Sequence, residues 1–90
     1  MHSIDIVIQN KLGLHARAAA KLTELASQFT DCEIFIARDK QRVNAKSIMG
    51  VMMLAAGMGV TVTVDAQGPQ AEEALKAIEA LILSKFGEAE

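Results

Sequence analysis

The residues of this chain best suited to chemistry are a histidine and an arginine two positions apart, His15 and Arg17. A polar turn at residues 10–13 precedes them, and an alanine-rich segment with helical periodicity follows. The first backbone N–H groups of a helix have no intrahelical acceptor, and with the positive end of the helix dipole they attract anions. Imidazole is a nucleophile, and guanidinium is a planar cation that binds phosphate. The arrangement therefore predicts a histidine that accepts a phosphoryl group.

A histidine without a chemical role is the alternative at this position. A single histidine in a turn is often only a solvated side chain, although histidine is not among the residues that helix N-caps prefer. A metal site made of His2, His15 and Cys32 is not supported, because the chain lacks paired ligand spacing. We expect neither a metal nor a cofactor.

The composition limits the possible partners and the location of the chain. Its 90 residues suffice for one domain, residues 1–90. A net charge of −2 without a basic run, and few aromatic residues, argue against nucleic acid as a partner. Glycines interrupt the longest apolar run, residues 48–64, so we expect no membrane span. With one cysteine and no signal pattern at the N-terminus, we expect a cytoplasmic protein.

Periodicity predicts seven elements in the order βαββαβα. The expected strands are residues 4–9, 33–37, 42–44 and 60–65, and the expected helices are residues 16–29, 48–54 and 72–86. Four strands in one sheet, with one face covered by helices, make a two-layer α+β domain of the open-faced sandwich type. We expect Gly57 to end the second helix and residues 87–90 to be a frayed tail. Gly13 would allow the backbone to bend and a partner to approach.

The expected helix at residues 48–54 is a second candidate site. Ser47 is a good N-cap for it, but Gly50 inside it costs about 1 kcal/mol relative to alanine. The helix is too apolar for every side chain to face a core, so some must be exposed. We assign Val51 and Leu54 to the core. Methionine adapts to varied surfaces, and an exposed apolar patch marks an interface, so Met49 and Met52 are candidates for binding a protein.

Two sequence runs together resemble the signatures of one protein family. The runs NKLGLHAR, residues 10–17, and KSIMGVM, residues 46–52, are similar to those of HPr, the histidine-containing phosphocarrier of the bacterial phosphoenolpyruvate-dependent phosphotransferase system. The resemblance extends over the whole chain and implies a four-stranded antiparallel sheet covered on one face by three helices. It also implies that His15 accepts a phosphoryl group on Nδ1 from enzyme I and passes it to a histidine on the A domain of an enzyme II.

The same resemblance implies roles for other residues. Arg17 would steady the phosphate, and Ser47 would be phosphorylated by an ATP-dependent HPr kinase/phosphorylase where one exists. Partner docking would use residues that flank the two phosphorylation sites: Ala16, Ala20, Ile48, Met49 and Met52. We expect a monomer, since the docking face must be free.

The chain departs from the family pattern in two places. The family commonly has proline after the arginine, and here the residue is Ala18. Residues 55–59 are also less polar than expected, which affects partner choice more than phosphate transfer. A nitrogen-branch phosphocarrier, a purely regulatory HPr-like protein acting through Ser47, and a small-molecule-binding module of ferredoxin-like fold remain alternatives. The run KSIMG favours the kinase-regulated type over the nitrogen branch.

Overall fold

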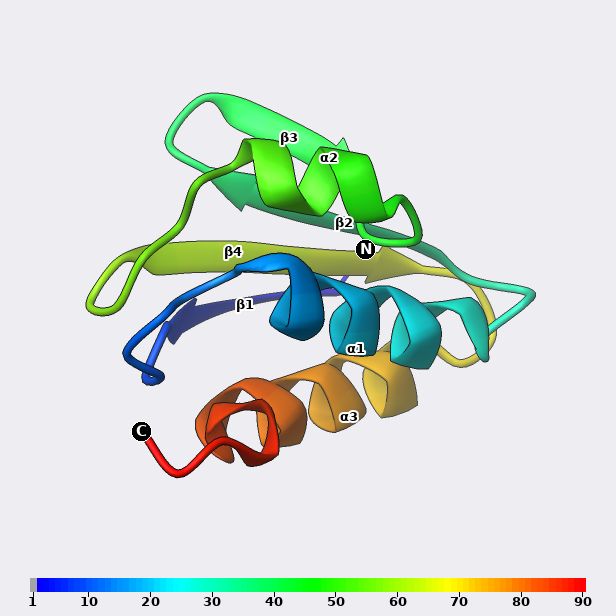
Figure 1. Ribbon diagram of the computed structural model, residues 1–90. Coiled ribbons are helices and arrows are strands. Elements are labelled where there is room, and N and C mark those ends of the chain that lie inside the picture. The colour runs from blue at the N-terminus through cyan, green and yellow to red at the C-terminus, as the bar shows by residue number, and fades with distance from the viewer. Residues whose placement is uncertain (1) are drawn as a thin grey trace.

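The computed structural model describes residues 2–90, and its strands form one four-stranded sheet. The strands are β1 (His2–Val7), β2 (Glu33–Arg38), β3 (Gln41–Asn44) and β4 (Thr61–Gln67). Their order in the sheet is β1-β4-β2-β3, and every neighbouring pair is antiparallel. The predicted βαββαβα order is confirmed. The strand order required the tertiary structure, because β4 lies between two strands that precede it in the chain (Figure 1).

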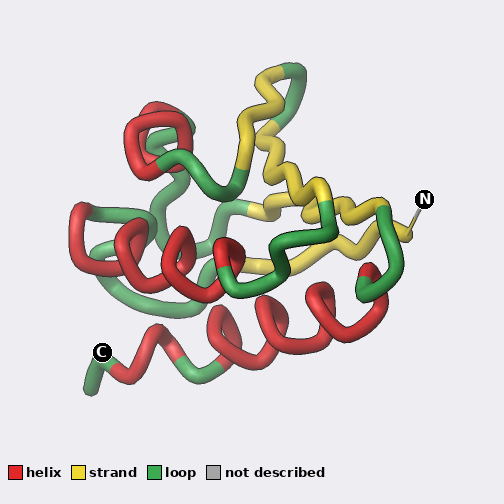
Figure 2. Tube along the Cα trace, turned by 90° about the vertical axis from the view of Figure 1, so that its right-hand side faces the viewer, coloured by secondary structure: helices red, strands yellow, loops and turns green. Residues whose placement is uncertain are grey.

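Three helices cover one face of the sheet, as the open-faced sandwich requires (Figures 1 and 2). They are α1 (Ala16–Ser27), α2 (Ile48–Met53) and α3 (Ala71–Leu83), and a short 3₁₀ turn, η1 (Lys85–Gly87), follows α3. Helix α1 packs against both α2 and α3. None of the helices within residues 2–90 has the length and apolar character needed to cross a bilayer.

The scarcity of aromatic residues predicts a core that is aliphatic and rich in methionine, and only the first half of this prediction is confirmed. The core between sheet and helices is aliphatic, but Met49, Met52, Met53 and Met58 are all exposed, because the branched side chains of the strands and the small alanines of the helices fill the space. Alternation along the strands places one face of each against the helices, and isoleucine and valine supply most of this face: Ile6, Ile34, Ile36, Val62 and Val64. Helices α1 and α3 meet them with Ala18, Ala19, Leu22, Ala26, Ile78 and Ile82. Small alanines on α1 let this helix lie close to the sheet, so a core can form without large aromatic side chains.

Helix α2 begins as predicted but ends differently. The Ser47 side chain accepts a hydrogen bond from the Gly50 N–H at 3.2 Å, so it caps the helix. A Cβ on Gly50 would lie 3.3 Å from both Ser47 Oγ and Val43 Cβ, which explains a glycine inside this helix. The prediction that Gly57 ends the helix is wrong. The helix ends at Met53, and Ala55 takes the left-handed conformation (φ 50°) that turns the chain.

The C-terminal segment is not the continuation of a helix into a frayed tail. Helix α3 ends at Leu83 rather than Phe86, and Lys85 and Phe86 both adopt positive φ, at 61° and 57°. This reversal buries Phe86, whose carbonyl accepts a hydrogen bond from Lys21 Nζ at 2.6 Å. The tail then passes beside the turn between β1 and α1, where the Lys11 N–H donates to the Glu90 carbonyl (Figure 1).

Gly13 brings the turn before α1 into contact with the connection after α2. Its φ is 65°, and a Cβ there would lie 2.5 Å from the Ala56 carbonyl oxygen and 2.7 Å from Gly57 Cα. The neighbouring Leu14 N–H donates to the same Ala56 carbonyl at 2.9 Å. The expected bend is confirmed, but what approaches Gly13 is the chain's own backbone, not a partner.

Replacement of Gly13 by alanine tests this contact. We expect Gly13→Ala to lower the free energy of unfolding by about 2–4 kcal/mol, since strain at positive φ adds to a backbone collision. Urea denaturation measures the change. Gly59→Ala is the matched control, because Gly59 also has positive φ (87°) but open space around it. An equal loss in the two variants would mean that the contact with residues 56–57 contributes nothing.

Candidate functional site

His15 is the N-cap residue of α1 and leaves the first turn of that helix open. Its backbone is extended (φ −75°, ψ −179°), and its side chain makes no capping hydrogen bond. The Ala19 N–H is the first to reach an acceptor at the helix start, the His15 carbonyl at 2.8 Å. The N–H groups of Ala16, Arg17 and Ala18 therefore precede the regular hydrogen bonding of the helix and are suited to hold an anion.

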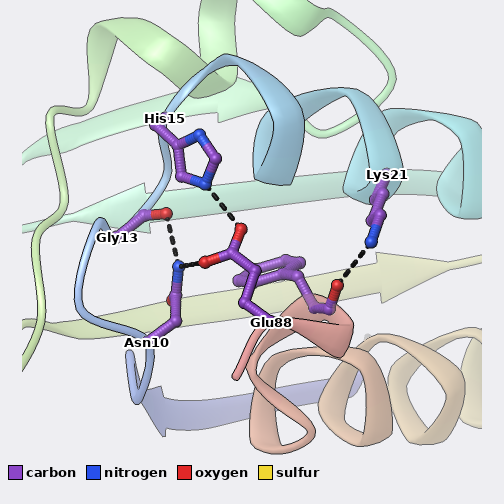
Figure 3. Close-up of polar contacts among 6 residues, drawn as sticks. Asn10, Gly13, His15, Lys21 and Glu88 are labelled. Carbon is purple, nitrogen blue, oxygen red and sulfur yellow. Dashed lines mark hydrogen bonds and ion pairs between the residues drawn. The ribbon is translucent and has the colours of Figure 1, made fainter. Parts of the chain in front are cut away.

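A carboxylate from the C-terminal tail contacts the histidine. Glu88 Oε2 lies 2.6 Å from His15 Nε2. Glu88 Oε1 accepts a hydrogen bond from Asn10 Nδ2 at 3.0 Å, and the same amide nitrogen donates to the Gly13 carbonyl at 2.9 Å. Figure 3 shows Glu88 between these two side chains, so residues 10 and 88 together determine where the imidazole lies.

These hydrogen bonds change the acidity of the carboxyl group. The pKa of Glu88 is lowered from 4.5, chiefly by the hydrogen bond with His15 and next by the one with Asn10. Burial opposes the change, while the positive charges of His15 and Arg17 lower the pKa further. Only 15% of the Glu88 side chain is exposed. The group is therefore a carboxylate at neutral pH and only accepts hydrogen bonds.

The other imidazole nitrogen, Nδ1, lies on the ring edge that faces away from Glu88 (Figure 3). A depression of about 660 Å³ adjoins the histidine, and Lys11, Arg17 and the C-terminal tail form much of its lining. Arg17 is exposed, and no hydrogen bond or ion pair engages its guanidinium within residues 2–90. The site can thus offer a phosphate a nucleophilic nitrogen, open backbone N–H groups and a cation that is free to bind it.

The second motif forms an apolar patch on α2. Val51 and Leu54 are buried, as the sequence predicts. The apolar patch consists of the exposed Ile48, Met49, Met52 and Met53. Ala20 lies exposed one turn beyond Ala16 on α1, and α1 packs beside α2. Ser47 is exposed at the start of α2. No group of three or more potential metal-ligating side chains occurs in the part of the chain that the structure describes.

Comparison with known proteins identifies the family. The sequence model of the PTS HPr component phosphorylation site matches residues 2–84. The chain belongs to the HPr family. It is 57% identical to phosphocarrier protein HPr of Cupriavidus necator over 96% of each chain. It is 51% identical to phosphocarrier protein NPr of Shewanella violacea over 94% of this chain and 92% of that one. A crystal structure of HPr from Thermoanaerobacter tengcongensis superimposes over the full length of both chains, with a TM-score of 0.95 and 48% identity.

Sequence reasoning missed two residues of this HPr-like site. Asn10 is fully buried within the first motif, and an asparagine in a polar turn gives no sign of burial. Glu88 lies in an acidic tail that has no periodicity. Its position depends on the reversal at Lys85 and Phe86, two residues without the glycine or asparagine that usually signals positive φ.

The acidity of Glu88 can be measured directly. We expect carbon-13 NMR of the side-chain carboxyl to give a midpoint below 4.5 in the wild type. In His15→Ala the midpoint should move toward 4.5, because the largest cause of the lowered pKa is gone. The contact stabilises the folded tail above the ordinary carboxyl pKa, and this contribution is lost as pH falls through the lowered value. An unchanged midpoint in His15→Ala would contradict the assignment.

Proposed function

We propose that this chain is a cytoplasmic phosphocarrier that receives a phosphoryl group on His15 Nδ1 from phosphorylated enzyme I. It then passes the group to a histidine on the A domain of an enzyme II. The observation that carries the proposal is the position of His15 at the start of α1, with Nδ1 turned away from Glu88 and Arg17 exposed beside it. Membership of the HPr family supports the same conclusion.

Phosphoryl transfer to this chain needs a nucleophile and groups that stabilise the negative charge of the phosphate. Nδ1 attacks the phosphorus as the bond to the donor nitrogen breaks, and the donor nitrogen keeps the electron pair. The open N–H groups of Ala16 and Arg17 donate to phosphate oxygens, and the Arg17 guanidinium adds charge-assisted hydrogen bonds. Because these donors are exposed rather than enclosed, they stabilise the phosphate without trapping it. A carrier must release its group as readily as it accepts it.

The apolar patch on α2 is the surface we assign to docking of enzyme I and of the A domains. Ile48, Met49 and Met52 lie there, and Ala16 and Ala20 extend the surface onto α1. Met49 is 66% exposed, which is high for so large an apolar side chain on a small protein. We expect the chain to act as a monomer, so that this surface is available to one partner after another.

Two further functions are proposed for the same chain: regulation by phosphorylation of Ser47, and phosphoryl transfer in the nitrogen-related branch of the system. An HPr kinase/phosphorylase would modify the exposed Ser47 hydroxyl and add about −1.5 to −2 charges beside the patch. The similarity to an NPr protein supports a nitrogen-branch phosphocarrier as the second candidate function. The two branches differ in the partner proteins and not in the chemistry of His15, so charging by enzyme I of each branch distinguishes them.

Phosphoryl transfer from phosphoenolpyruvate tests the main proposal. The purified chain is incubated with enzyme I, magnesium and labelled phosphoenolpyruvate, alongside His15→Ala. We expect acid-labile, base-stable label on the wild type alone, as a phosphorus–nitrogen bond requires. If enzyme I becomes charged but neither protein is labelled, His15 is not a phosphoryl acceptor, and the regulatory alternative through Ser47 takes its place.

A charge at Ser47 tests regulation and docking together. We expect Ser47→Asp to slow phosphorylation by enzyme I by about 2- to 10-fold, because the carboxylate repels an acidic partner surface at the edge of the patch. The thermal midpoint should hardly change, since aspartate is also a good N-cap. Ser27→Asp, at the far end of α1, is the control and should keep the wild-type rate. A wild-type rate of phosphorylation in Ser47→Asp would contradict the proposed regulation through Ser47.

A further inference from the structure

The contact between Glu88 and His15 has a chemical consequence for the nucleophile. A neutral imidazole carries one proton, on either Nδ1 or Nε2, and only the nitrogen without the proton has a lone pair for attack. Glu88 Oε2 lies 2.6 Å from Nε2, which is hydrogen-bonding distance. A carboxylate can only accept, so Nε2 must donate and therefore holds the proton. The lone pair is then on Nδ1, the nitrogen that faces away from Glu88 (Figure 3).

The carboxylate is itself held in place from two directions. Asn10, fully buried, donates to its other oxygen at 3.0 Å and is anchored to the Gly13 carbonyl at 2.9 Å. Two residues before Glu88, the reversal at η1 buries Phe86, and Lys21 binds the Phe86 carbonyl. These contacts fix the point from which the tail begins. Glu88 is thus positioned by the core and by the turn that carries the histidine, which a loosely attached tail would not achieve.

The same contact matters after the phosphoryl group arrives. When neutral imidazole attacks through Nδ1, the new phosphorus–nitrogen bond leaves the ring positive with its proton still on Nε2. The donor, a phosphohistidine of enzyme I, loses its phosphorus–nitrogen bond and keeps the electron pair. The negative charge of Glu88 faces the developing imidazolium at Nε2 and stabilises it, in the same way that a buried carboxylate supports a catalytic histidine. No proton has to leave the ring during transfer.

We propose that Glu88 is a positioning residue for phosphoryl transfer, which holds the proton of His15 on Nε2 and balances the positive charge formed when Nδ1 is phosphorylated. The inference rests on the proposed function. It assigns to the C-terminal tail a part in the reaction that the two sequence motifs do not contain.

The charges around the pair are compatible with this role. Arg17 contributes positive charge near Glu88, and Lys11 pairs with Glu90 at 3.4 Å on the same side of the site. These cations offset two carboxylates that would otherwise repel an incoming phosphate. A rival interpretation makes Glu88 an inhibitory gate that phosphate must displace. The two predict opposite effects when the charge is removed.

Glu88→Gln removes the charge but keeps the size of the side chain. An amide can donate or accept, so it no longer selects one tautomer. Once the nitrogen-15 shifts of the imidazole no longer change with rising pH, they should show only the Nε2–H form in the wild type. They should show a mixture in Glu88→Gln. Phosphorylation by enzyme I should be about fivefold slower, the difference between a charge-assisted and a neutral hydrogen bond.

Glu90→Gln is the matched control for the tautomer, because it removes the same charge from the same tail. Among the ion pairs of residues 2–90, Glu90 pairs only with Lys11. It should keep the wild-type tautomer, because Lys11 and not His15 is its ion-pair partner. Glu73→Gln, in the exposed first turn of α3, is the control for the rate and should keep the wild-type value. An unchanged tautomer and rate in Glu88→Gln would overturn the inference, and so would faster phosphorylation, which would make Glu88 a gate. If enzyme I fails to label the wild type, the proposed function fails, whereas the tautomer measurement still tests the contact by itself.

Discussion

The close approach of Gly13 to the backbone at residues 56–57 is the contact on which the rest of the site depends. It packs the turn before α1 against the connection after α2, and the Leu14 N–H completes the contact through the Ala56 carbonyl at 2.9 Å. Two motifs about thirty residues apart are thereby joined in space. His15 begins one helix and Ser47 the other, and these helices pack side by side. A side chain at position 13 would separate the nucleophile from the surface to which its partners are proposed to bind.

The electrostatics of the site combine two opposing requirements. A phosphate needs positive charge and open N–H groups, which Arg17 and the first turn of α1 provide. If His15 is phosphorylated as proposed, its ring becomes positive, and the Glu88 carboxylate at Nε2 is placed to balance that charge. The two are compatible because they act on opposite edges of the imidazole. The carboxylate lies on the side of Nε2, and the proposed phosphate would bind on the side of Nδ1 (Figure 3).

The apolar patch illustrates how a very short helix can present a defined surface. The Ser47 cap and the close contact of Gly50 with Val43 orient α2 on the sheet. With the orientation set, Val51 and Leu54 face inward and the methionines at 49, 52 and 53 face outward. Gly50 lowers the helix propensity of this segment, but its small size permits the packing of α2 on the sheet. Flexible methionine side chains then suit a surface that is proposed to bind several partners.

Local sequence patterns were enough to predict the element order, the aliphatic core and the location of both motifs, because periodicity and capping act over a few residues. They placed His15 at a helix start and separated Val51 and Leu54 from the exposed methionines. They failed where long-range packing decides backbone shape. Ala55 rather than Gly57 turns the chain after α2, and Lys85 and Phe86 adopt positive φ so that Phe86 is buried. That reversal, together with the buried Asn10, brings Glu88 to His15 across 73 positions of sequence. Only the folded chain could determine this contact, since no local pattern encodes a meeting between its two ends.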